Sequence, residues 1–499
     1  MRQKNFPRVL AVGLDAAEPT FVRRLIEEGA LPTLKHLREQ GAWSRVESPA
    51  HLGSGAVWPT FFTGTEPAEH GIYSEWCWQP ETMSLVRYDG RRLTPFWKEL
   101  AQKGVTVGIF DVPFAPPVGL SQGFEVAEWG AHDVVAGHLQ VAPNELAELV
   151  TKQVTPHPFS FGGQGATGPD DLEGLRKLSA ACLEGVRLRG ELAARLLQKT
   201  RPQLSLIIFP EIHHAAHQLW HTVVPDHPLY AREKLPNARG VEPTLADILR
   251  EVDRQIARLV ETVGDGAAVL VFSLHGMRPT GRLPAFLGPL LCETGFSRVA
   301  GWATQSWPER AFSLLAAVKR RTPTGLKRLY HRRLPREVTQ RLAQPVTFQA
   351  YDWQQTRAFA LPTDQHGWIR INLAGREAKG CVPVARYQEI CRELEELLRS
   401  LVTEDGRPLV RDIIRTAEHG ENALTQYIPD LVVHWHEHAF ELPMRVRGLL
   451  LEAHPATVGL TGQHAPDGFC IFPGREGPAR ETFSATELHR IIIAALAEG

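Results

Sequence analysis

Two histidines in the segment Glu211–His217 have the four-residue spacing that places two side chains on one face of a helix. If the segment is helical, His213 and His217 can bind one metal ion through their ring nitrogens. A third histidine, His464, occurs far along the chain in a stretch predicted to be a glycine-rich loop. Structural histidines that bond to backbone carbonyls are the alternative interpretation of the cluster near residue 213. The spacing therefore indicates a metal centre and leaves that alternative open.

A serine with the surroundings of a nucleophile stands between two glycines. Gly53 and Gly55 flank Ser54 and allow close approach of the backbone, and an apolar stretch predicted to be helical follows. A hydroxyl in that position could attack phosphorus, helped by backbone N–H groups at a helix N-terminus. Gly-Ser-Gly is also a common turn, so the local sequence alone leaves both interpretations open.

Short apolar runs that are typical of buried strands precede the polar groups of the candidate site. Val9–Leu14 ends at Asp15, Leu204–Phe209 leads into the first two histidines, and Ala267–Ser273 is followed by His275. Ligands bind at the carboxyl ends of strands in open α/β sheets, so we expect these groups to meet there. Helical spacing of apolar residues after the first strand predicts the crossover helix of a βαβ unit.

The order of these motifs resembles that of the type I phosphodiesterase and nucleotide pyrophosphatase family, a branch of the alkaline phosphatase superfamily. The resemblance covers most of the chain and includes Gly13–Asp15, Trp58–Gly71, Ser273–Met277, Ile371–Glu377, Pro429–Leu431 and Gly462–His464. It implies an alkaline phosphatase-like fold, in which helices sandwich a doubly wound, mostly parallel α/β sheet. It also implies a smaller cap or subdomain that helps to shape the substrate cleft.

The same resemblance implies two divalent ions, commonly zinc, at the carboxyl ends of the central strands. The ligands of the first ion would be three histidines, His213, His217 and His464. The second ion would take three side chains that this chain retains, Asp15, Ser54 and His275, together with an aspartate at a position that is Leu274 here.

Two acidic ligands of the family are therefore replaced. His213 can still bind a borderline metal through nitrogen, whereas Leu274 has no donor atom. Two divalent ions would bring four positive charges against two negative charges on Asp15 and an ionised Ser54, and an anionic substrate would have to neutralise the excess. One ion nearly balances these charges. We expect a divalent metal, most simply zinc, and the sequence leaves one or two ions open.

The implied reaction is hydrolysis of a phosphate ester, in particular a phosphodiester or nucleotide pyrophosphate. Ser54 would attack phosphorus in line, and metal-activated water would hydrolyse the covalent seryl intermediate. With one ion, Asp15 or His275 would act as general base for the serine. Cleavage of a sulfate ester, phosphonate or phosphomonoester stays open, because a fold does not fix its substrate. A catalytically silent homologue that binds an anion or a partner protein also stays open, since two acidic ligands are missing.

Composition agrees with a large soluble enzyme that acts on a small anionic phosphoester. The chain has 499 residues, 43% hydrophobic and 22% charged, and its net charge of −1 argues against binding of a nucleic-acid polymer. No secretory signal or membrane-spanning run is recognisable, and the six cysteines show no disulfide or zinc-knuckle spacing. We therefore expect a cytoplasmic location without membrane association. The oligomeric state is not indicated.

Three segments are predicted along the chain. Residues 1–290 would form the first part of the core, residues 291–349 an inserted basic segment, and residues 350–499 the rest of the core with a small subdomain and the last metal-ligand loop. Nine Lys or Arg residues and one Glu occur between Lys319 and Arg341. This basic run is either a solvated helical face or a cationic lid over an anionic substrate.

Two further regions carry predictions. Residues 134–170 are rich in Pro, Gly and His and are expected to form loops near the mouth of the site. In the small subdomain, Asn372 and Arg376 could contact substrate or could hold a glycine turn through local hydrogen bonds.

Overall fold

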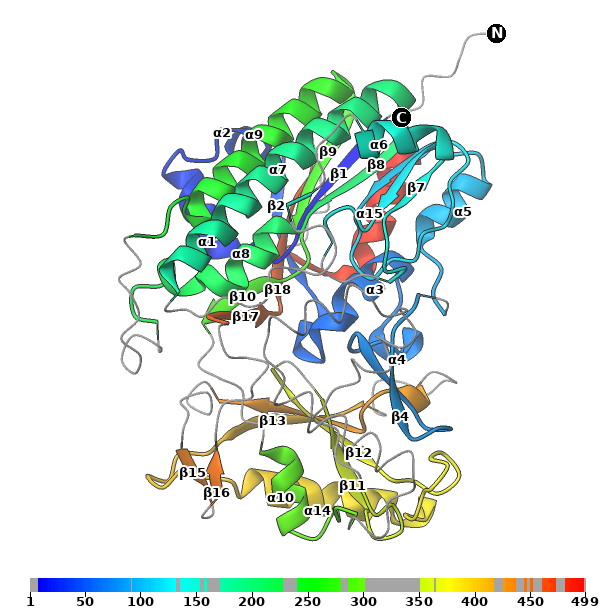
Figure 1. Ribbon diagram of the computed structural model, residues 1–499, viewed down its shortest axis with the longest axis vertical. Helices are drawn as coiled ribbons and strands as arrows, with labels where there is room; N and C mark the ends of the chain where they lie inside the picture. Colours follow the sequence, from blue (N-terminus) through cyan, green and yellow to red (C-terminus); the bar gives the residue numbers. More distant parts are fainter. Residues whose placement is uncertain are drawn as a thin grey trace. The chain divides into compact units, whose positions relative to one another are not determined.

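The chain forms two compact units, shown in Figure 1. The first unit contains Met1–His70, Asp89–Arg282 and Pro455–Gly499, and the second contains Gly71–Tyr88 and Leu283–His454. The second unit thus includes residues 71–88, which the sequence analysis assigned to the first part of the core. The computed structural model describes residues 8–90, 92–131, 135–152, 157–158, 171–227, 240–279, 286–300, 351–362, 365–416, 425–436, 444–446, 449–451, 460–472 and 481–497.

Two of the predicted regions fall wholly or partly outside the described residues. The basic run from Lys319 to Arg341 lies outside them, and so do residues 134, 153–156 and 159–170 of the predicted loops. Within the described part of the chain, no helix has the length and apolar composition of a transmembrane segment.

A large, mostly parallel sheet is the centre of the first unit, with nine strands among the described residues. Its strand order is β19 (Thr482–Ser484), β2 (Ala42–Glu47), β18 (Asp467–Phe472), β9 (Ala267–Ser273), β1 (Arg8–Leu14), β8 (Leu204–Phe209), β5 (Val107–Phe110), β6 (Gly123–Ala127) and β7 (Gln140–Ala142). The five strands from β9 to β6 are parallel, while β18 and β7 run antiparallel to their neighbours. The predicted doubly wound α/β fold is confirmed.

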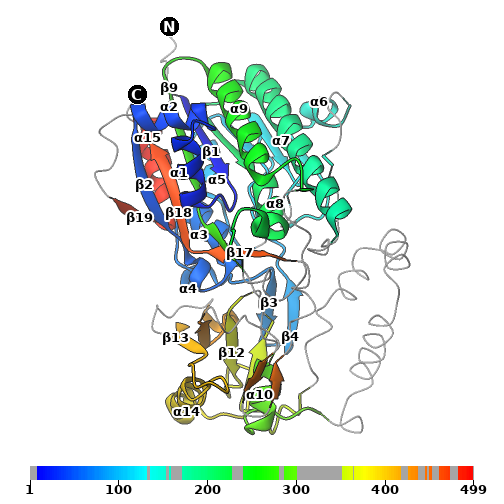
Figure 2. The same cartoon turned by 90° about the vertical axis from the view of Figure 1, so that its left-hand side faces the viewer.

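One face of this sheet is covered by helices that share a single hydrophobic core with it. They are α1 (Pro19–Glu27), α2 (Pro32–Gln40), α7 (Leu172–Thr200), α8 (Glu211–Leu219) and α9 (Leu245–Val263). The long α7 and α9 lie side by side in both Figure 1 and Figure 2. The carboxylate of Asp253 in α9 accepts hydrogen bonds from the backbone N–H groups of Thr33 and Leu34, and so caps the start of α2.

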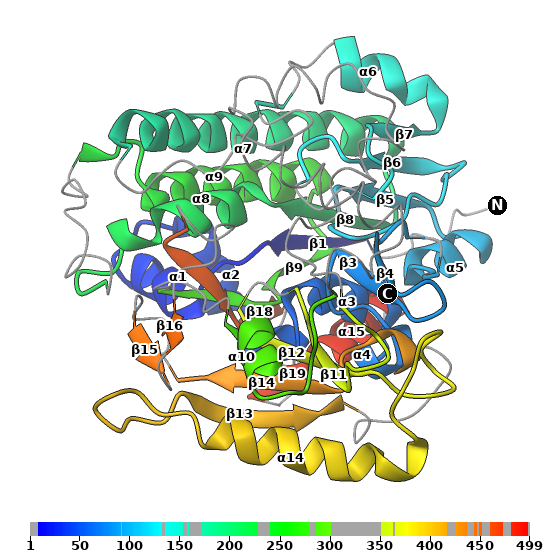
Figure 3. The same cartoon turned by 60° about the horizontal axis from the view of Figure 1, so that its bottom comes forward.

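The opposite face carries α3 (Val57–Thr63), α5 (Phe96–Gln102) and α15 (Ala485–Ala497). Figure 3 shows α3 and α15 across the sheet from α7 and α9. Packing is close around Gly13 in β1, where an added Cβ would lie 2.5 Å from Ile208 Cδ1 and 3.3 Å from Trp58 Cη2. A side chain at this position would crowd Ile208 of the neighbouring strand first, and the indole of Trp58 also packs against the strand there.

The second unit is built on a four-stranded antiparallel sheet with helices packed on its core. Its described elements include β11 (Ala358–Leu361), β12 (Gly367–Ile371), β14 (Leu431–Trp435), β13 (Val410–Arg415), α10 (Leu287–Glu293), α14 (Tyr387–Arg399) and the hairpin of β3 (Trp76–Gln79) with β4 (Ser84–Arg87). Arg376 pairs with Asp430, and Asn372 donates to the carbonyls of Trp353 and Thr356. Bonds within the turn, from Asn372 to the Lys379 carbonyl and from Arg376 to the Ile371 carbonyl, add to these long-range contacts. Contact of either residue with substrate stays a prediction.

Replacing Gly13 by alanine tests the close packing of α3 on the sheet. The new methyl group has to displace Ile208 or Trp58, and overpacking of this kind costs about 1–3 kcal/mol of unfolding free energy. Gly288→Ala is the matched control, because the atom nearest to its added Cβ is Tyr351 Oη at 3.8 Å. Thermal unfolding should show a lower melting temperature for Gly13→Ala and no decrease for Gly288→Ala. Equal stability of the two variants would contradict the packing described here.

Candidate metal centre

The predicted site residues follow parallel strands that end side by side. β1 pairs in parallel with β8 and with β9. Asp15 follows β1, the helix α8 follows β8, and His275 follows β9. All of these elements belong to the first unit, at the sheet edge where open α/β folds bind ligands.

The rings of His213, His217 and His464 meet at one point. The Nε2 atom of His213 lies 2.7 Å from that of His217 and 2.7 Å from that of His464, and the last two atoms are 3.1 Å apart. Nitrogens bound to a tetrahedral zinc ion at about 2.0–2.1 Å are about 3.3 Å from one another, so small outward shifts of the rings would accommodate an ion. Within the described part of the chain, these three histidines form the group able to hold a metal ion.

The outer ring nitrogens identify the tautomers of two of these histidines. Nδ1 of His213 lies 3.0 Å from Oδ2 of Asp15, and Nδ1 of His217 lies 2.9 Å from the carbonyl oxygen of Gly462. A carboxylate and a carbonyl can only accept, so both Nδ1 atoms carry the proton. With a metal ion bound, the Nε2 atoms of both rings would therefore present their lone pairs to the common point. This donor set fits zinc or another borderline metal.

His464 reaches the cluster from a short strand, so the prediction of a loop at this position is wrong. It belongs to β17 (Gly462–Ala465), which pairs with β10 (Gly276–Pro279). An added Cβ on Gly462 would lie 2.5 Å from the carbonyl oxygen of Ala216, so only glycine lets β17 pack against α8. Thr461 N–H also donates to the His217 carbonyl at 2.7 Å. Pairing of β10 with β17 had no recognisable signal in the sequence.

Asp15 is fully buried and lies directly behind His213. Besides the contact with His213, its Oδ1 atom accepts a hydrogen bond from Trp58 Nε1 at 3.0 Å and lies 3.9 Å from Nδ1 of His275. The next residue, Ala16, has a φ of 58°, in the left-handed region that non-glycine residues rarely adopt. Strained backbone of this kind is concentrated at functional sites.

The other three positions considered for the site are His275, Leu274 and Ser54. The His275 ring is buried, with its centroid 4.8 Å from that of His464 and 5.9 Å from that of His213. Leu274 is fully buried and provides no ligand atom. Ser54 is half-buried and begins the short 3₁₀ helix η2 (Ser54–Ala56), which leads directly into α3.

The segment that carries Ser54 is anchored next to the cluster on both sides. One turn after Ser54, the indole of Trp58 donates to Asp15. Before it, Ser48 Oγ donates to the carbonyl of Pro466 at 3.1 Å, two residues beyond His464. These contacts bring the serine segment to the same edge of the sheet as the three imidazoles.

A buried network of charges that the sequence analysis missed lies under the start of α8. Arg189 of α7 donates through Nη1 to Asp111 and through Nε to Glu211, each at 2.8 Å, and all three side chains are fully buried. His157 Nε2 lies 2.9 Å from the same Glu211 oxygen. Burial alone would raise the pKa of Glu211, but Arg189 and His157 outweigh it and lower this pKa to about 2. Glu211 is thus ionised and ties the first turn of α8 to α7.

The sequence contains a signal for this network in the periodicity of α7. Arg189 stands at a position where Cys182, Gly185, Leu192 and Ala193, at helical spacing around it, are all buried. A charged residue on the apolar face of a helix requires a buried partner. Gly185 completes the arrangement, because an added Cβ there would lie 2.5 Å from His157 Nε2.

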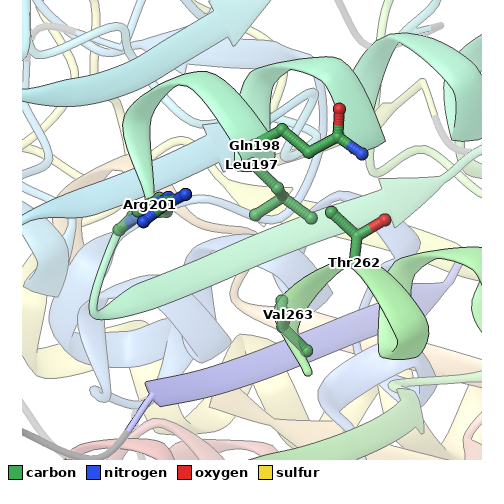
Figure 4. Close-up of a pocket in the computed structure, with 6 residues that line it drawn as sticks. Leu197, Gln198, Arg201, Thr262 and Val263 are labelled. Atoms are coloured by element: carbon green, nitrogen blue, oxygen red, sulfur yellow. The ribbon is translucent and has the colours of Figure 1, made fainter. Parts of the chain in front are cut away.

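A separate pocket lies at the C-terminal ends of α7 and α9, as Figure 4 shows. It is lined by Leu197, Gln198, Arg201, Pro202, Thr262 and Val263. These residues precede β8 and β9, so the pocket lies at the amino ends of the strands, opposite the edge with the histidines. It has no part in the chemistry of the site.

Comparison with known proteins found a matching family and solved structures with a similar fold. The family described as type I phosphodiesterase / nucleotide pyrophosphatase matches residues 9–440. Phosphonoacetate hydrolase from Sinorhizobium meliloti 1021, solved with phosphonoformate, has a TM-score of 0.51 at 15% identity, covering 99% of this chain and 96% of that one. Murine ectonucleotide pyrophosphatase / phosphodiesterase 5, solved with AMP, has a TM-score of 0.47 at 13% identity, covering 98% and 95%. No curated protein sequence matches the chain.

Replacing Arg189 by methionine tests whether the buried network stabilises the base of α8. The substitution leaves Glu211 and Asp111 as buried carboxylates without their cation, and loss of one partner of a buried pair costs about 3–5 kcal/mol. Arg187→Met is the matched control on the same helix, because Arg187 pairs with Glu184 at the surface, where ion pairs contribute about 0–1 kcal/mol. Denaturant unfolding should give Arg189→Met a clearly lower free energy of unfolding than Arg187→Met. Similar unfolding free energies would contradict this role of Arg189.

Proposed function

The chain belongs to the type I phosphodiesterase / nucleotide pyrophosphatase family of hydrolytic enzymes, and we propose that it cleaves a phosphodiester or nucleotide pyrophosphate with a metal ion and Ser54. The observation that carries the proposal is the convergence of three imidazole Nε2 atoms at the carboxyl ends of the strands. A small anionic phosphoester is the expected substrate class, in keeping with the family.

His213, His217 and His464 would hold the ion, and three neutral imidazoles with an open position are typical of catalytic zinc. A divalent ion bound there would polarise a non-bridging oxygen of the substrate and stabilise the charge that develops in the transition state. The proposal assigns one tightly bound ion to each chain. It does so because Leu274, at the position of a family aspartate, is buried and has no donor atom.

Ser54 supplies the nucleophile in this proposal. Its oxygen forms a bond to phosphorus while the bond to the leaving oxygen breaks, which gives a phosphorylated serine and the free alcohol or nucleotide product. Water then cleaves the serine–phosphorus bond and restores the hydroxyl. Of the two candidate bases for Ser54, His275 is favoured, since both oxygens of Asp15 already have close nitrogen partners in Trp58 and His213.

Metal analysis of purified protein tests the three-histidine centre. Wild-type protein prepared without chelators should contain about one equivalent of a divalent metal such as zinc, and removing the metal should abolish hydrolysis. His217→Ala should lose the metal, because one of three ligands is gone. His214→Ala is the matched control, since His214 is the adjacent histidine of α8 but lies outside the group of three. Equal metal content in the two variants would show that the cluster is not the binding site.

Replacement of Ser54 tests the nucleophile. Ser54→Ala should reduce turnover by at least about 10³-fold, because no covalent intermediate can form. Ser54→Thr, which retains a hydroxyl, should keep measurable turnover. Both are assayed on aryl phosphodiesters, phosphonates, phosphomonoesters and sulfates, and the diester is expected to react fastest. An active Ser54→Ala variant would remove the proposed nucleophile, while faster turnover of another ester would correct the substrate class.

A further inference from the structure

We infer that Asp15 is a positioning residue of a single metal centre, which orients His213 from behind and does not itself bind an ion. The inference rests on the proposed function, because it concerns the same three histidines. It differs from what the family resemblance implies, since that resemblance makes Asp15 a direct ligand of a second ion.

The first argument is the place of Asp15 relative to the ring of His213. Its carboxylate contacts Nδ1, whereas the common point of the three histidines lies at Nε2. These two nitrogens face different directions from the ring, so the imidazole separates Asp15 from an ion bound at Nε2. Among the described residues, the group able to hold a metal contains His213, His217 and His464 without Asp15.

The second argument is that the carboxylate is held in this orientation by other residues. Trp58 Nε1 donates to Oδ1 at 3.0 Å, while Oδ2 lies 3.0 Å from His213. The indole itself is packed against β1, where its Cη2 atom would lie 3.3 Å from a Cβ added to Gly13. A fully buried carboxylate with one oxygen fixed by an indole can hold the His213 ring in one rotamer and one tautomer.

The third argument concerns charge at position 213. The family resemblance implies an aspartate there, which would bring a negative charge directly to the ion. An imidazole ligand would bring no negative charge, but the carboxylate of Asp15 behind it would return one to the centre and make the imidazole a stronger donor. His217 has a weaker version of this support, because its Nδ1–H donates to the uncharged carbonyl of Gly462.

The test measures metal affinity and stoichiometry in Asp15→Asn, by competition with a chromophoric chelator. Asparagine can still accept a hydrogen bond from His213 but carries no charge, so the metal should bind about 10–100-fold more weakly, with one equivalent per chain unchanged. Trp58→Phe keeps an aromatic ring and removes the donor, and it should weaken binding by a smaller factor. Asp253→Asn is the matched control, since Asp253 is an equally buried carboxylate of the same unit whose described hydrogen bonds come from Thr33 and Leu34 at the start of α2, away from the histidines.

A second measurement does not depend on metal binding. Nitrogen-15 NMR of histidine-labelled, metal-free protein should show His213 with its proton on Nδ1 in the wild type. Asp15→Leu should shift the ring-nitrogen signals of His213 and leave those of His217 unchanged. Unchanged affinity in Asp15→Asn, or a fall from two equivalents to one, would overturn the inference and leave the three-histidine centre standing. A wild-type protein that binds no divalent ion would instead overturn the proposed function.

Discussion

Three imidazole nitrogens that face one another at the end of a parallel sheet are the feature on which the rest of the molecule depends. Lone pairs at this separation repel unless a cation or proton lies among them, so the fold has to hold the rings in place. Contacts on the outer side of the rings, away from the common point, hold them there. Asp15 holds His213, the carbonyl of Gly462 holds His217, and the pairing of β17 with β10 brings in His464. The outer contacts therefore determine the geometry of the centre.

Two buried carboxylates lie near the centre, and each has close partners. Asp15 contacts Trp58 and His213, and Glu211 at the start of α8 contacts Arg189 and His157. Desolvation makes such groups costly unless they are paired, so each pair restricts how its elements can move. The helix that carries two of the three histidines is thus tied at its first turn to α7 and at its last turn to Thr461. We attribute the rigidity that a metal centre requires to these two attachments.

Sequence reasoning identified the elements that depend on local pattern. The mostly apolar run of β8 and the helical spacing of His213 and His217 led directly to the strand and helix observed. Features that depend on long-range packing could not be derived in this way. The strand that carries His464, the direction of Asp15 toward His213, and the partners of Arg189 all arise from contacts between segments distant in the chain. The buried arginine was visible as an exception in an apolar pattern, but its partners were not.

X-ray absorption spectroscopy of the zinc- or cobalt-loaded protein tests the central claim most directly, because it reports which atoms bind the ion. The account predicts one ion per chain with three imidazole nitrogens at about 2.0–2.1 Å and the multiple-scattering features of histidine rings. A first shell dominated by carboxylate oxygens, or a metal–metal vector from a second ion, would contradict it.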